Sequence, residues 1–182
     1  MAQHIVLLRG INIGSRNRVA MPKLRDALAE AGFADVRTYV QSGNVVLSSA
    51  QKSDAVVRNV RRVITTEFGL DVAVVTRTRA QLAKVVEGNP LARVAKDPKR
   101  YQVSFLDAKP SRAVVRRIEA AADPKERVVV DGREIYAWHP DTIARSKLWA
   151  LLAGQDLGVT ATARNWTTVQ KLLALAGAPA PS

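Results

Sequence analysis

The alternation of apolar and polar residues over the first 77 positions predicts four strands and two helices. The continuous apolar run at residues 5–8 is too short for a helix and predicts a strand buried on both faces. Pro22 and Gly32 mark the start and end of a helix whose apolar residues recur at helical spacing. The other expected elements are a hairpin over 36–40 and 44–48, a helix over 53–68 and a strand over 72–77. This β-α-β-β-α-β order is the ferredoxin-like arrangement.

The second half of the chain shows a similar order of patterns, which suggests an internal structural duplication. After a short helix near 81–87, the expected elements are a strand over 101–106, a helix over 110–122, a hairpin over 128–130 and 135–138, and helices over 141–153 and 165–176. We therefore predict an α+β fold in which a ferredoxin-like βαββαβ unit is followed by a related, packed second α+β half. The expected divisions are residues 1–77, residues 78–176 and a flexible tail over 177–182.

Composition adds a strongly basic balance to this picture. The 182 residues carry a net charge of +12, and the sequence pI is about 10.7. The charge is shared between the halves, with +5 over residues 1–77 and +7 over residues 78–182, and there is no polybasic tail. A polyanion-binding surface and a basic surface that merely reflects an Arg-rich and Ala-rich composition both remain open.

Several classes of protein and site are disfavoured. The chain has no cysteine, which excludes disulfides, thiolate nucleophiles and zinc-thiolate clusters. No apolar run approaches the roughly 18 to 20 residues that span a bilayer, and no signal-peptide pattern precedes the first strand, so we expect a cytoplasmic protein without a membrane partner. His4 and His139 lack metal-ligand spacing, and neither a P-loop nor a G-x-S-x-G elbow is present. We expect no metal and no cofactor.

The first candidate site is the loop between the first strand and the first helix. Glycines, cations and a helix N-terminus meet there, and no acidic residue lies between Arg9 and Arg25, so backbone N–H groups and positive charge can attract an anion. The alternative is a long surface connection whose glycines supply positive φ. The candidate ligand-binding residues are Arg9, Gly10, Asn12, Gly14, Arg16, Arg18 and Lys23.

The turn Gln41-Ser42-Gly43-Asn44 supplies two more candidates, Ser42 and Asn44. In a split βαβ unit the second strand runs parallel to the first, so this turn should lie at the same end of the sheet as the first loop. The two motifs could then form one site. A tight hairpin turn without a ligand is the alternative.

A third group of candidates lies late in the chain. Arg145 and Lys147 fall in a predicted helix, while Arg164, Asn165 and Trp166 precede and begin another. Capping by Thr162 or Asn165 and packing of Trp166 would account for part of this motif without any ligand. Arg145, Lys147 and Arg164 are the residues that capping and packing leave unexplained.

Three stretches together resemble the bacterial domain of unknown function 1697 family. They are residues 7–14 (Leu-Leu-Arg-Gly-Ile-Asn-Ile-Gly) with Met21 and Leu24, residues 38–45 (Thr-Tyr-Val-Gln-Ser-Gly-Asn-Val) and residues 162–169 (Thr-Ala-Arg-Asn-Trp-Thr-Thr-Val). The resemblance spans nearly the whole chain and implies a duplicated α+β fold related to the ferredoxin-like class. It implies no activity.

These observations favour an uncharacterised protein that binds an anionic ligand through its basic loops. The ligand would be a phosphorylated small molecule or a nucleic-acid backbone. The alternatives are an enzyme acting on a phosphorylated small molecule, with Arg and Asn supplying electrostatic positioning, and a structural or partner-binding module. Base stacking on the sheet is disfavoured, because the central strands carry aliphatic residues rather than aromatic platforms.

Overall fold

The computed structural model describes residues 1–179, which divide into two compact units. The first unit comprises residues 1–84 together with residues 171–179, and the second comprises residues 85–170. The units divide between residues 84 and 85, a few residues after the division expected from the sequence at residue 77. Helix α3 (Arg79–Gly88) therefore begins in the first unit and ends in the second. Residues 180–182 of the expected tail lie outside the described residues.

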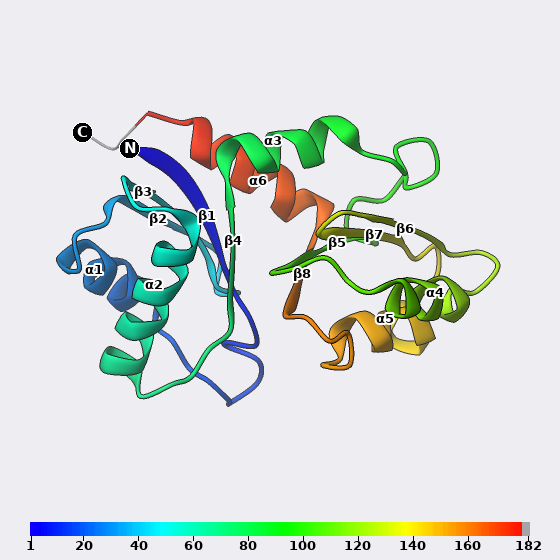
Figure 1. The fold of residues 1–182 in the computed structure, drawn as a ribbon, viewed down its shortest axis with the longest axis horizontal. Helices are drawn as coiled ribbons and strands as arrows, with labels where there is room; N and C mark the ends of the chain where they lie inside the picture. The colour runs from blue at the N-terminus through cyan, green and yellow to red at the C-terminus, as the bar shows by residue number, and fades with distance from the viewer. Residues whose placement is uncertain (180–182) are drawn as a thin grey trace. The chain divides into compact units, whose positions relative to one another are not determined.

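The first unit has the predicted ferredoxin-like topology. Its elements are β1 (Ala2–Leu8), α1 (Met21–Glu30), β2 (Ala34–Tyr39), β3 (Asn44–Ser49), α2 (Ser53–Phe68) and β4 (Val74–Thr78). The strands form one antiparallel sheet in the order β2-β3-β1-β4, and α1 and α2 cover one of its faces (Figure 1). The local patterns therefore predicted both the elements and the way in which they pair.

Burial of β1 agrees with the prediction of a strand protected on both faces. Val6 and Leu8 join Leu28 of α1 and Ile64 of α2 in one apolar cluster. Leu7 points to the opposite face of the sheet and is also fully buried. The uninterrupted apolar run in the sequence is explained by this two-sided burial.

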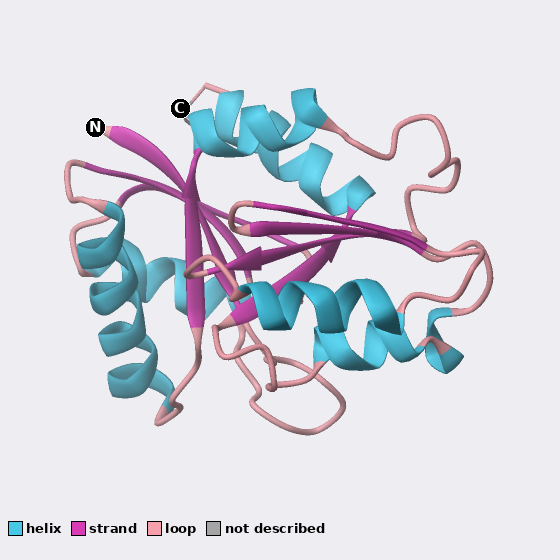
Figure 2. Cartoon of the chain, turned by 45° about the vertical axis from the view of Figure 1, so that its right-hand side comes forward, coloured by secondary structure: helices cyan, strands magenta, loops and turns pink. Residues whose placement is uncertain are grey.

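The second unit repeats this order of strands and helices. Its elements are β5 (Tyr101–Leu106), α4 (Arg112–Ala121), β6 (Arg127–Asp131), β7 (Glu134–Trp138), the 3-10 helix η1 (Ile143–Arg145), α5 (Lys147–Ala153) and β8 (Ala161–Asn165), followed by α6 (Trp166–Gly177), which ends in the first unit. The antiparallel sheet has the order β6-β7-β5-β8, equivalent to that of the first unit. Figure 2 shows α4 and α5 lying together against one face of this sheet. The predicted duplication of element order is confirmed.

Two details of the second unit differ from the sequence-based expectation. The helix expected over 141–153 is interrupted at Ser146, whose backbone is extended and whose Oγ accepts a hydrogen bond from the N–H of Trp149. Ser146 therefore caps a shorter helix, as serine commonly does. Strand β8 also occupies residues that the sequence assigned to the approach to the last helix. Its alanine and threonine residues carry little of the β-branched aliphatic signal that identified the other strands.

His4 gives the first unit a predicted sensitivity to acid. Its side chain lies in β1 with an exposed fraction of 2%, and burial lowers its pKa below the ordinary value of 6.5. The folded state therefore disfavours the protonated ring. The contribution of His4 to the free energy of unfolding should be fully present above about pH 6.5 and should decrease as the pH falls below that value. Urea unfolding at about pH 7.5 and pH 5.5 should show a smaller pH-dependent loss in His4→Leu than in the wild type. Equal losses in the two proteins would contradict this assignment.

Candidate functional site

The loop after β1 is held in shape by the side chain of Asn12. Its Nδ2 donates to the carbonyls of Val19 (2.9 Å) and Gln41 (2.8 Å), and its Oδ1 accepts from the N–H of Val19 (2.9 Å). A second amide, from Asn17, donates to the carbonyl of Gly10 at 3.0 Å. The bond to Gln41 joins the loop to the β2–β3 turn, so the prediction that the two motifs lie at one end of the sheet is confirmed.

Gly43 brings the β2–β3 turn into contact with the end of β1. Its carbonyl accepts a hydrogen bond from the N–H of Leu8 at 2.8 Å, and its φ is 77°. A Cβ at this position would lie 2.7 Å from the Cβ of Leu8 and 3.1 Å from the side chain of Ile11. Only glycine satisfies both this positive φ and this close approach without a shift of the surrounding residues.

The same turn contains a backbone conformation that is unfavourable for its residue type. Val40 has a φ of 51° and a side chain that is 53% exposed. A β-branched residue in this left-handed region is uncommon and costs roughly 1 to 2 kcal/mol. Strained residues of this kind concentrate at functional sites, where the surrounding structure enforces them. Here Val40 directly precedes Gln41, which Asn12 ties to the loop.

The structure separates the candidates of the first unit into structural and available groups. Asn12 uses its amide inside the protein, and Asn44 is fully buried, with its Nδ2 donating to the carbonyl of Tyr39 and the Oγ of Ser42. Lys23 donates to the carbonyl of Glu67 at 3.1 Å and lies over the ring of Phe68. These contacts place Lys23 against the end of α2.

The available cations of the loop are the arginines near its tip. Arg16 and Arg18 are exposed, and within residues 1–179 neither side chain forms an ion pair or a hydrogen bond. Arg9 is half-buried at the start of the loop and already interacts with other groups. Gly10 and Gly14 have positive φ values of 67° and 57°, with open space where a Cβ would stand. A ligand can therefore approach the backbone there.

The late motif is largely structural. Arg164 is buried in β8, where its Nη1 donates to Thr162 Oγ1 and the Ala163 carbonyl, both at 2.8 Å, and burial lowers its pKa to about 10. Trp166 is buried and stacks on Tyr101 with ring centroids 4.8 Å apart. The capping and packing alternative therefore describes what these side chains do.

Asn165 and the two cations on either side of Ser146 complete the late group of candidates. Asn165 Oδ1 accepts from the N–H of Thr168 at 2.9 Å, which is the capping interaction that the sequence offered as an alternative. Arg145 and Lys147 are exposed on either side of Ser146, whereas Arg164 is buried in the sheet. Burial therefore distinguishes Arg164 from the other two cations.

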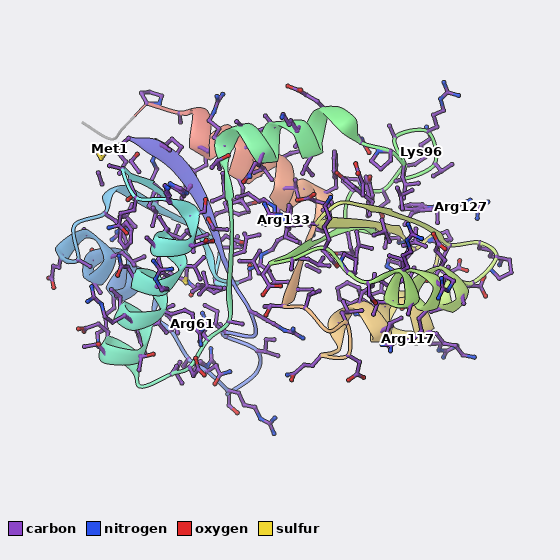
Figure 3. The ribbon with its side chains drawn as sticks, in the orientation of Figure 1. Met1, Arg61, Lys96, Arg117, Arg127 and Arg133 are labelled. Atoms are coloured by element: carbon purple, nitrogen blue, oxygen red, sulfur yellow. The ribbon has the colours of Figure 1, made fainter. Side chains whose placement is uncertain are left out.

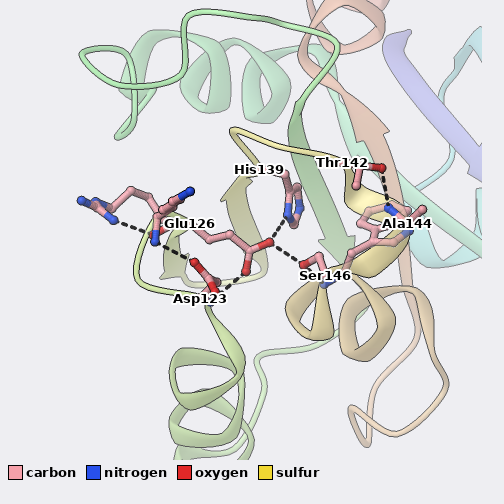
Figure 4. Close-up of polar contacts among 9 residues, drawn as sticks. Asp123, Glu126, His139, Thr142, Ala144 and Ser146 are labelled. Carbon is pink, nitrogen blue, oxygen red and sulfur yellow. Dashed lines mark hydrogen bonds and ion pairs between the residues drawn. The ribbon is translucent and has the colours of Figure 1, made fainter.

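A polar network in the second unit was not identified from the sequence. The carboxylate of Glu126 accepts from the hydroxyl of Ser146 at 2.5 Å and from the N–H of Asp123 at 2.9 Å, and its Oε1 lies 2.7 Å from Nδ1 of His139 (Figure 4). His139 in turn packs edge-on against Trp149. Glu126 and His139 are both buried.

These contacts determine the charge state of Glu126. Burial by itself would raise its pKa, but the hydrogen bonds from Ser146, His139 and the Asp123 N–H, together with the charge of His139, hold the pKa below the ordinary value of 4.5. The carboxylate is therefore ionised at neutral pH. The arrangement is not a nucleophilic triad, because the serine hydroxyl is bonded to the carboxylate rather than to the imidazole.

Basic side chains elsewhere are distributed rather than gathered in one place. Four exposed cations that Figure 3 labels lie on α2 (Arg61), the connection between α3 and β5 (Lys96), α4 (Arg117) and β6 (Arg127). Several have local partners; Arg61, for example, pairs with Asp71 at 2.8 Å. The net charge therefore locates no site by itself.

Within residues 1–179, no helix combines the length and apolar character needed to cross a membrane. The same residues contain no group of three or more His, Cys, Asp or Glu side chains placed to hold a metal ion.

Comparison with known proteins places the chain in a family. A family described as "Protein of unknown function (DUF1697)" matches residues 1–136, which include the β1 loop and the β2–β3 turn. The chain belongs to the DUF1697 family. The comparison with curated proteins gave no match.

A solved structure supports the same fold for this DUF1697 protein. The conserved bacterial protein SP0830 from Streptococcus pneumoniae is similar, with a TM-score of 0.79 and 20% sequence identity. The similarity covers 96% of this chain and 98% of that one. At this level of identity the comparison establishes the α+β fold and says nothing of a ligand.

Proposed function

We propose that the surface formed by the β1 loop and the β2–β3 turn, residues 9–18 and 40–44, binds the phosphate groups of an anionic ligand. The observation that carries this proposal is the exposure of Arg16 and Arg18 on a loop whose backbone Asn12 fixes against the turn. Because the loop backbone is already fixed, less backbone conformational entropy is lost when the loop binds a ligand. This surface is called the loop–turn surface below.

Other features of the loop–turn surface support phosphate as the recognised group. No acidic residue interrupts the sequence from Arg9 to Arg25, so the local potential is positive. The open positions at Gly10 and Gly14 allow backbone N–H groups to approach an oxyanion. The strain at Val40 is consistent with a turn whose conformation serves a ligand rather than stability.

The phosphate could belong to a small molecule or to a nucleic-acid backbone, and one experiment distinguishes the two. The protein is titrated with pyrophosphate, with a mononucleoside triphosphate and with a fluorescent single-stranded oligonucleotide, each at two salt concentrations. Backbone binding predicts that the oligonucleotide is preferred and that its affinity falls steeply with salt. A small-molecule site predicts that a short phosphorylated probe binds as tightly as the oligonucleotide. Turnover of the triphosphate, followed by phosphate release, would support the enzyme alternative.

The double substitution Arg16→Ala/Arg18→Ala should weaken binding of the preferred probe by about tenfold, because two phosphate contacts are lost. For the oligonucleotide, the slope of log K against log salt should become shallower by about 1.4, since each cation contributes about 0.7 for a single strand. The matched control is Arg58→Ala/Arg62→Ala, which removes the same charge from the exposed surface of α2. An equal loss in the two double variants would assign binding to net charge and contradict the proposal.

A further inference from the structure

The second unit contains a cavity of about 440 Å³ beside the Glu126 network. Its walls are the turn 123–126 that follows α4, the connection 140–142 that follows β7, and Arg145 with Ser146 at the start of α5. The volume lies within the range of roughly 300 to 1,000 Å³ that small-molecule sites occupy. All of these residues belong to one compact unit.

The walls of this cavity are fixed by hydrogen bonds. Glu126 accepts from Ser146 of one wall and from the N–H of Asp123 of another, so its carboxylate joins two of the three segments (Figure 4). Within the turn 123–126, Asp123 Oδ1 accepts from the N–H of Lys125 at 3.0 Å. In the connection after β7, Thr142 Oγ1 accepts from the N–H of Ala144 at 3.3 Å. The carboxylate of Glu126 is therefore held in position before a ligand binds.

The cavity is lined by two cations, Lys125 and Arg145, and by three carboxylates, Asp123, Glu126 and Asp141. Arg145 is exposed, and among residues 1–179 its side chain forms neither a hydrogen bond nor an ion pair. Glu126 accepts three hydrogen bonds, two at Oε1 and one at Oε2, whereas a carboxylate can accept about four. One acceptor position of Glu126 therefore remains. The nearby Lys125–Asp141 pair is long, at 3.8 Å, and exposed, so it contributes little to closing the cavity.

We propose that this cavity binds a small molecule that carries an anionic group next to a hydroxyl or ammonium donor. Arg145 contacts the anionic group, and Glu126 accepts a hydrogen bond from the donor. A molecule with only one of the two groups leaves either the guanidinium of Arg145 or the remaining acceptor position of Glu126 without a ligand partner. This site lies in the other unit from the loop–turn surface, so the two proposals succeed or fail independently.

The test uses O-phosphoethanolamine, which carries both groups, with inorganic phosphate and ethanolamine as its two halves. Backbone amide shifts of the ¹⁵N-labelled full chain report where each probe binds. O-Phosphoethanolamine should shift the amide signals of residues 123, 125, 126 and 141–146 with a Kd of about 1 mM or tighter, and each half should bind more weakly. An absence of shifts at these residues, or equal affinity for ethanolamine alone, would overturn the proposal.

Arg145→Gln supplies the residue-level test. It should weaken O-phosphoethanolamine binding by about tenfold to a hundredfold, the range expected for a charge-assisted hydrogen bond. Lys147→Gln removes the same charge two residues away at a position that does not line the cavity, and it should bind like the wild type. Both residues are exposed, so neither change should unfold the protein. Wild-type affinity in Arg145→Gln, or an equal loss in both variants, would contradict the proposed role of Arg145.

Discussion

Replacing Gly43 by alanine should lower the free energy of unfolding by about 3 kcal/mol. The new Cβ would stand 2.7 Å from the Cβ of Leu8, a contact with a rigid part of a buried strand rather than with a flexible chain end. A positive φ of 77° adds a cost of roughly 1 to 2 kcal/mol, and crowding adds roughly 1 to 3 kcal/mol. Urea unfolding followed by far-ultraviolet circular dichroism measures the sum.

Gly14→Ala is the control that separates these two contributions. Gly14 also has a positive φ, of 57°, but no atom lies within 4 Å of the position that a Cβ would take. Its substitution should therefore cost only about 1 kcal/mol. If both variants lose the same stability, the close approach of the turn to β1 contributes nothing and backbone conformation accounts for the whole effect.

Removing the carboxylate of Glu126 should have an effect of similar size. Glu126→Ala leaves the Ser146 hydroxyl, the Asp123 N–H and His139 without the acceptor they share, and it should cost about 3 kcal/mol or more. Glu119→Ala, an exposed change on α4, should stay within about 0.5 kcal/mol of the wild type. A loss in Glu126→Ala no larger than that of the control would mean that the network contributes no stability.

The same variant has a predicted pH signature. Because the folded protein lowers the pKa of Glu126, its carboxylate stabilises the fold fully above the ordinary value of 4.5. That contribution is lost as the pH falls through the lower folded pKa. The stability difference between wild type and Glu126→Ala should therefore shrink in acid, and a difference that stays constant would contradict the assigned charge state.

The sequence predicted the elements with strong local signals and missed those without them. The β1 run, the Ser42-Gly43 turn and the helix ending at Gly69 carry their information within a few residues, and the structure has each of them. Strand β8 consists of small and polar residues that gain their strand character from pairing with β5. Its existence depends on tertiary contacts that no local pattern contains.

The candidate sites show the same limit for side chains. The sequence makes Asn12 and Asn44 candidates because they lie in a loop and a turn expected to form one site, yet their side-chain amides bind backbone carbonyls of the loop and turn. The sequence does not indicate Glu126 as a site residue, because its partners His139 and Ser146 lie 13 and 20 positions further along the chain. The spacing of Asp123 and Glu126 signals only a local turn. Their shared contacts exist only in the folded unit.

The end of the chain completes a unit that the start of the chain begins. Arg37 of β2 donates to the carbonyls of Leu175 and Ala178, and the guanidinium of Arg79 lies beside Gly177. During synthesis, the strands and helices of residues 1–84 leave the ribosome before these partners have been made. The first unit therefore becomes complete only after residues 85–170 of the second unit have been made, because the carbonyl partners of Arg37 follow those residues in the sequence.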